Sequence, residues 1–147
     1  MNEHDLALRN QVYRRFVELG RAPALEEIAD EAGLSHEDTA ATLRRLHDAH
    51  ALVLEPDRVE VRMANPFSAV PTPHRVEAAG RSWYANCAWD GFGIPAALGA
   101  DGHISSSCPD CGEGIEIDVV ERRPVPDRDV VHLLVPARRW WDDIVFT

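Results

Sequence analysis

Pro66, Pro71 and Pro73 lie within one short stretch and divide the chain into two parts of different character. Proline has no backbone N–H to donate and interrupts regular structure, so a linker is predicted there. The residues before the stretch have the pattern of three helices and a hairpin, and those after it have the pattern of several strands with one helical segment. At 147 residues the chain can hold a small domain beside a medium one. We therefore predict an α+β protein with two domains, 1–65 and 66–147.

The first part has the pattern of three helices followed by a β-hairpin. A first helix is predicted to end at Gly20, a second to span about 24–32 before Gly33, and a third to begin at Ser35. The inward stripe of the first helix is expected to contain Leu6, Val12, Phe16 and Leu19. Residues 52–54 and 59–61 flank a turn and predict the hairpin. This order of elements is that of a winged-helix-like domain.

The second part has the pattern of a small mixed α/β domain of a catalytic type. A strand is expected at 74–78, and residues 83–98 are expected to be helical in their first half, with interruptions at Gly91, Gly93 and Pro95. Three further strands are predicted, at 103–106, 114–120 and 130–135.

Cys87 and Asp90 are the most informative pair of residues for function. Their three-residue spacing places a thiol and a carboxyl group on one face of a helix. A thiolate is a soft, metal-seeking nucleophile, and a nearby carboxylic acid can deliver a proton. The helix start is expected to lower the pKa of Cys87, and an apolar pocket of aromatic rings to raise that of Asp90. The rings expected there are those of Trp83, Tyr84, Trp89 and Phe92. The alternatives are a buried structural cysteine and a solvated aspartate.

Cys108 and Cys111 form a C-x-x-C pair followed by Gly112. Two thiols are half of the ligand set of a structural zinc site, so either a turn with two free thiols or a metal site completed by Cys87 or His103 is open. The three cysteines are an odd number, which argues against a disulfide framework and for reactive or metal-bound thiols.

Charge and hydropathy limit the partners. The net charge is −10, and the first 66 residues carry 8 arginines against 13 acidic residues. A DNA-binding role for the predicted winged helix is therefore disfavoured, and an auxiliary role is preferred. No apolar run is long enough to cross a membrane, and the N-terminus lacks the pattern of a signal peptide. We expect a cytoplasmic protein without nucleic-acid or membrane partners.

Three blocks of sequence resemble the alkylmercury lyases (organomercurial lyases). They are residues 86–90 (Asn-Cys-Ala-Trp-Asp), 94–99 (Ile-Pro-Ala-Ala-Leu-Gly) and 105–108 (Ser-Ser-Ser-Cys). The resemblance implies an enzyme of mercury resistance that cleaves carbon–mercury bonds and releases hydrocarbon and Hg(II). It implies Cys87 as the thiolate that takes mercury, Asp90 as the proton donor, an organomercurial substrate, thiol acceptors for Hg(II), and no organic cofactor.

The second catalytic cysteine of that family is expected about where this chain ends. The apolar segment 140–146 favours a sequence that continues beyond Thr147, and Cys108 or Cys111 are alternative second thiols. The mercury ligands predicted within the chain are therefore Cys87, Cys108 and Cys111, with structural zinc at Cys108 and Cys111 a further option. The alternative function is a thiol-based protein that binds Hg, Zn or Cu without turnover. A metal-sensing regulator is a third hypothesis, which the acidic charge disfavours.

Overall fold

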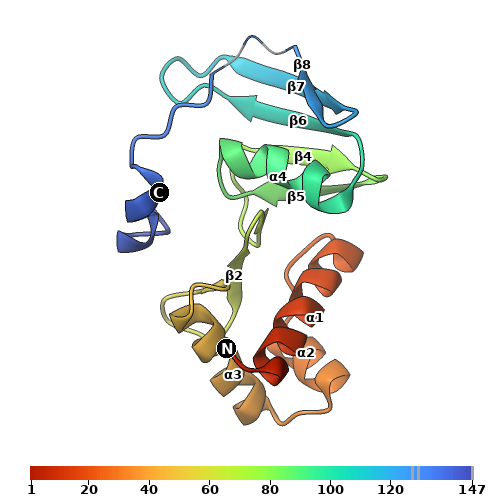
Figure 1. The fold of residues 1–147 in the computed structure, drawn as a ribbon, viewed down its shortest axis with the longest axis vertical. Coiled ribbons are helices and arrows are strands. Elements are labelled where there is room, and N and C mark those ends of the chain that lie inside the picture. Colours follow the sequence, from red (N-terminus) through yellow and green to blue (C-terminus); the bar gives the residue numbers. More distant parts are fainter. Residues whose placement is uncertain (127, 129, 147) are drawn as a thin grey trace.

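The computed structural model describes residues 1–126, 128 and 130–146. Three helices form one end of the molecule, and a large antiparallel sheet with one helix against it forms the other (Figure 1). The helices are α1 (Glu3–Leu19), α2 (Leu25–Ala32), α3 (His36–Asp48) and α4 (Ala88–Leu98), with a 3-10 helix η1 (Ala137–Asp142). The strands are β1 (Val53–Leu54), β2 (Val61–Ala64), β3 (Phe67–Ser68), β4 (Arg75–Ala78), β5 (Arg81–Ala85), β6 (Gly102–Ser107), β7 (Gly114–Val120) and β8 (Arg123–Val125). The mixed α+β class is confirmed.

The three N-terminal helices begin and end where the local sequence predicts. Gly20 and Gly33 follow α1 and α2 in the left-handed conformation, which glycine adopts without steric cost. Ser35 caps α3 by accepting a hydrogen bond from the Asp38 N–H at 3.1 Å. In the stripe of α1, Val12 and Phe16 are buried as expected, but Leu6 is exposed and Leu8 occupies the core instead.

The eight strands of the described residues pair antiparallel in one sheet with the order β1-β2-β3-β5-β4-β6-β7-β8. The sheet runs from the predicted hairpin through the proline-rich stretch, because β3 pairs with both β2 and β5. The strands predicted at 74–78, 103–106 and 114–120 correspond to β4, β6 and β7. Within the described residues, no helix combines the length and apolar character needed to cross a membrane.

The core connects the helical end of the molecule to the sheet through three aromatic side chains. The ring of Phe67 lies 5.5 Å from that of Phe16 and 5.9 Å from that of Trp83. The indole N–H of Trp83 also donates to the backbone carbonyl of Phe16 at 3.1 Å. Aromatic pairs at such separations add stabilisation beyond the area they bury. Residues from both predicted parts therefore share one core.

The predicted helix at 83–98 starts later than expected. Its first residues belong to β5, where Trp83 and Ala85 are buried and Tyr84 is exposed, which is the alternation of a strand. The helix α4 then continues through Gly91, Gly93 and Pro95, so the predicted interruptions are wrong. The helix lies so close to its neighbours that a Cβ atom on Gly93 would come within 2.9 Å of Pro66. The glycines thus serve close packing rather than a break.

The strand predicted at 130–135 is absent. Among the residues that the structure describes, 130–135 have no ladder partner, and β8 is the last strand of the sheet. The apolar run instead lines a cavity beside α4, with side chains that stay largely exposed, such as Val130 at 89% and Leu134 at 82%. A short apolar run is compatible with either outcome, because periodicity does not say which surface will cover it.

Candidate active site

Helix α4 packs on β4, β5 and β6, and its first turn carries the predicted thiol and acid. Cys87 is the N-cap residue, with extended backbone, and Asp90 is in the first turn. The Cys87 thiol lies near enough to the Asp90 carboxyl group to influence its pKa. The side-chain amide of Asn86 donates to Asp90 Oδ2 at 3.2 Å and to Asn65 Oδ1 at 3.0 Å. The acid is therefore held on one side by an amide and on the other by the thiol.

Burial raises the pKa of the Asp90 carboxyl group, and the hydrogen bonds from Asn86 and Cys87 oppose this increase only in part. The direction agrees with the sequence-based prediction. Burial also raises the pKa of the Cys87 thiol, and the nearby carboxyl group adds to the effect. The prediction of a lowered thiol pKa is wrong, because desolvation of the thiolate outweighs the N–H groups at the helix start.

A cavity of about 840 Å³ opens next to this first turn. Cys87 and Phe92 from α4 line one side, and Ile104 and Cys108 from β6 and the turn after it line another. Residues 130–135 and two aromatic side chains near the C-terminal end of the chain complete the lining. The cavity is mainly apolar and brings two of the three thiols to one space.

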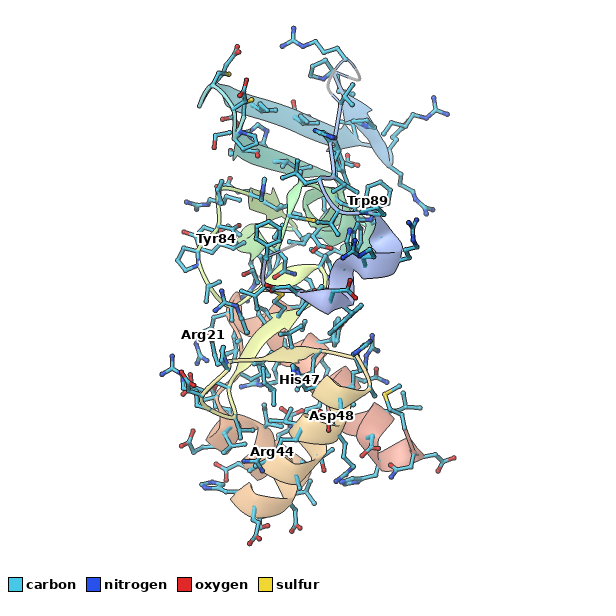
Figure 2. The ribbon with its side chains drawn as sticks, turned by 90° about the vertical axis from the view of Figure 1, so that its left-hand side faces the viewer. Arg21, Arg44, His47, Asp48, Tyr84 and Trp89 are labelled. Carbon is cyan, nitrogen blue, oxygen red and sulfur yellow. The ribbon has the colours of Figure 1, made fainter. Side chains whose placement is uncertain are left out.

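The aromatic pocket predicted around Cys87 and Asp90 is formed only in part. Phe92 lines the cavity, but Trp83 points into the core and donates to Phe16. Tyr84 and Trp89 are exposed, at 37% and 60%, and point to different sides of the molecule (Figure 2). The reason is that Trp83 and Tyr84 lie on a strand, where alternate side chains face opposite ways.

Cys108 and Cys111 lie in the turn that joins β6 to β7. Cys108 lines the cavity, whereas Cys111 is exposed and lies outside the described lining. The backbone N–H groups of Cys111 and Asp110, and then the Cys111 thiol, lower the pKa of Cys108. The two thiols therefore differ in their access to the cavity.

The zinc option at Cys108 and Cys111 does not fit the structure. Among the described residues, no group of three or more His, Cys, Asp and Glu side chains is placed to hold a metal ion. His103, a candidate third ligand, bonds instead to Asp118 at 2.7 Å and to Glu116 at 2.8 Å. Two thiols alone are too few for a structural zinc site, which requires four ligands.

His74 is a further polar residue of the cavity that its sequence position does not reveal. Its Nδ1 lies 2.8 Å from Ser106 Oγ, and burial lowers its pKa. The residue precedes β4 and meets Ser106 because β4 pairs with β6. The contact depends on how two strands distant in sequence are paired, so the residues next to His74 in the sequence give no indication of it.

The fold and the thiol–acid pair define a member of a known family. The family model for alkylmercury lyase matches residues 67–147, which is more than half of the chain. The chain belongs to the alkylmercury lyase family.

Curated relatives and a solved structure show the same similarity. The chain is 33% identical over 115 residues to an alkylmercury lyase of Staphylococcus epidermidis (strain ATCC 12228 / FDA PCI 1200), covering 76% of this chain and 51% of that protein. It is 29% identical over 120 residues to an alkylmercury lyase of Bacillus cereus, covering 80% and 53%. A crystal structure of the mercury-bound form of MerB2 aligns with TM-score 0.67 and 23% identity, over 86% of this chain and 62% of that one. The chain thus spans about half the length of the curated relatives.

Proposed function

We propose that the first turn of α4 cleaves carbon–mercury bonds in small organomercurials, releasing hydrocarbon and Hg(II). The observation that carries the proposal is the Cys87 thiol beside the half-buried Asp90 carboxyl group, at the wall of an apolar cavity. Membership of the alkylmercury lyase family favours cleavage over metal retention without turnover.

The first step is capture of mercury by Cys87. Burial raises the thiol pKa, so the resting group holds its proton at neutral pH. When the soft mercury atom bonds to sulfur, the thiol loses that proton and mercury loses its previous ligand. The Asp90 carboxyl group influences the thiol pKa, and we assign it as the acceptor of this proton. Capture of mercury therefore leaves Asp90 in its neutral, protonated form.

The second step is protonation of the carbon bound to mercury. Burial raises the pKa of Asp90, which favours the neutral acid and makes it a proton donor. As a second thiolate bonds to mercury, the carbon–mercury bond breaks and carbon takes the Asp90 proton. The products are hydrocarbon, a carboxylate on Asp90, and Hg(II) held between two sulfurs. No organic cofactor takes part, and small thiols can accept the Hg(II).

Within the described residues, Cys108 is better placed than Cys111 to act as the second thiol. Cys108 lines the same cavity as Cys87, and its lowered pKa favours the thiolate. A cysteine beyond Thr147, as the family resemblance implies, lies outside the described residues. Loss of hydrocarbon release in Cys108→Ser would support Cys108, and unchanged turnover would exclude it.

The test of the function is incubation of the protein with phenylmercury and excess small thiol, with benzene measured by gas chromatography. We expect benzene from the intact protein and from Glu26→Gln, a change on the exposed face of α2. Cys87→Ser should release none, since serine is a hard oxygen ligand with little affinity for mercury. Absence of benzene with the intact protein would refute the proposal for this chain.

For the N-terminal 65 residues we propose a winged-helix-like domain in an auxiliary role. The helices α1–α3 followed by the antiparallel β1–β2 pair support it, as does the excess of acidic over basic residues. Tight binding to duplex DNA at physiological salt would contradict the auxiliary role.

A further inference from the structure

The turn between β6 and β7 holds two thiols together at the rim of the cavity. The Cys108 N–H donates to the Glu113 carbonyl at 2.8 Å, and the Gly112 N–H donates to the Cys108 carbonyl at 2.9 Å. Gly112 has φ 75°, a conformation that glycine adopts readily. The two cysteines lie in the same turn, and the Cys111 thiol is near enough to lower the pKa of Cys108. The backbone therefore presents a ready-made pair of sulfur ligands.

Of the two cysteines in this turn, Cys108 lines the cavity and Cys111 is exposed to solvent. Cys87 lies in the first turn of α4, Cys108 lines the cavity with it, and Cys111 is exposed. The three thiols thus form a series from the helix to the surface. Cys108 is the middle member of this series, because it shares a cavity with Cys87 and a turn with Cys111.

The chemistry of this pair suits a soft ion with few ligands. A zinc site is excluded by the number of ligands, but Hg(II) is soft and is satisfied by two thiolates. We propose that Cys108 and Cys111 form an acceptor site for Hg(II), which takes the ion from Cys87 after cleavage. The inference rests on the proposed function, because it concerns the product of that reaction.

The transfer is a ligand exchange without change of oxidation state. Hg(II) first bridges the sulfurs of Cys87 and Cys108. A bond then forms between mercury and the Cys111 sulfur, and the bond to the Cys87 sulfur breaks. The proton of the Cys111 thiol passes to the Cys87 sulfur, which becomes a thiol again. Cys87 is thereby free for another substrate, and Hg(II) lies at the surface, where external thiols can reach it.

The test maps which thiols mercury protects. The full chain, reduced and freed of small thiols, receives one equivalent of phenylmercury or of HgCl2, and is then treated with iodoacetamide. Peptide mass spectrometry reports alkylation of each cysteine, and benzene is measured in the same tube. We expect Cys108 and Cys111 to be protected and Cys87 to be alkylated, with either mercury source. In Cys111→Ser the protection should move to Cys87, whereas Glu113→Gln, an exposed change in the same turn, should leave the pattern unaltered.

The two mercury sources separate the inference from the function on which it rests. Benzene release with Cys87 protected and Cys111 alkylated would overturn the acceptor site and leave the function intact. Protection of Cys108 and Cys111 by HgCl2, without benzene from phenylmercury, would support the acceptor site and refute the function. In Cys111→Ser, continued alkylation of Cys87 with Cys108 still protected would also overturn the acceptor site.

Discussion

Cys87 and Cys108 line the same cavity from different elements, the first turn of α4 and the turn that follows β6. Both side chains therefore border one space that a small mercury compound could enter. The helix start supplies the thiol with an acid beside it, and the sheet supplies the second sulfur. The packing of α4 on β4, β5 and β6 therefore decides whether the two thiols can cooperate.

Asp90→Asn should separate capture from cleavage. The amide cannot donate an acidic proton, so single-turnover hydrocarbon release should fall by about 100-fold or more. Mercury should still be retained at equilibrium, because Cys87 remains and buffer can take the thiol proton in place of Asp90. Gas chromatography of the hydrocarbon, together with the mercury retained after gel filtration, checks both parts. Equal rates in Asp90→Asn and the intact protein would rule out Asp90 as the donor.

Asn86→Ala should shift the pH profile of cleavage. The amide of Asn86 donates to Asp90 Oδ2 at 3.2 Å and lowers the carboxyl pKa against the effect of burial. Without that bond the pKa of Asp90 should increase, and its acid form should persist to higher pH. The alkaline limb of the cleavage rate should therefore move to higher pH. A lower rate at every pH with an unmoved limb would instead mean that Asn86 acts only in folding or binding.

His103 should make stability depend on pH. Hydrogen bonds from the ring to Asp118 and then Glu116 raise its pKa above the usual value. A raised pKa in the folded protein means that the contribution is fully present below about pH 6.5, the unfolded value, and is lost as pH rises through the folded pKa. Urea unfolding at several pH values should show this decrease, and His103→Gln should reduce it. A parallel pH dependence in both proteins would contradict the prediction.

Phe67→Ala should destabilise the connection between the helices and the sheet. Phe67 is 1% exposed and contacts the rings of Phe16 and Trp83. Loss of a buried phenyl ring leaves a cavity and should lower the free energy of unfolding by about 3–5 kcal/mol. Trp89→Ala, at a side chain that is 60% exposed, is the matched control and should change it by less than about 1 kcal/mol. Similar decreases in the free energy of unfolding in both variants would show that the contacts of Phe67 with Phe16 and Trp83 do not contribute specifically to stability.

Gly102→Ala should disturb the contact of α4 with the sheet. A Cβ atom there would lie 2.8 Å from Pro95 Cγ and 3.1 Å from the Glu77 carbonyl oxygen. Overpacking of this kind costs about 1–3 kcal/mol. Gly114→Ala, where an added Cβ atom meets nothing within 4 Å, should be tolerated. Thermal unfolding of the two variants compares them directly, and equal midpoints would refute the close-packing argument.

Local signals in the sequence account well for the helices and for the thiol–acid pair. Capping by Ser35 and the glycines after α1 and α2 act within a few residues, so pattern reasoning finds those helix ends. The same holds for Cys87 and Asp90, which are close in sequence and fall in the same turn of α4. Their catalytic roles stay predictions, as do the domain boundary and the mercury ligands.

Tertiary structure decided what depends on burial and on pairing between distant segments. Trp83 points into the core because its segment is a strand paired with β3 and β4. Residues 130–135 line a cavity, and within the described part of the chain no strand pairs with them. The thiol pKa of Cys87 is raised because packing removes water from it, which no neighbour in sequence can foretell. The order of residues specifies which thiols and acid the chain carries and which family it resembles. Only the fold decided that Cys87 shares a cavity with Cys108 while Cys111 faces solvent, since that arrangement depends on how α4 packs against β6.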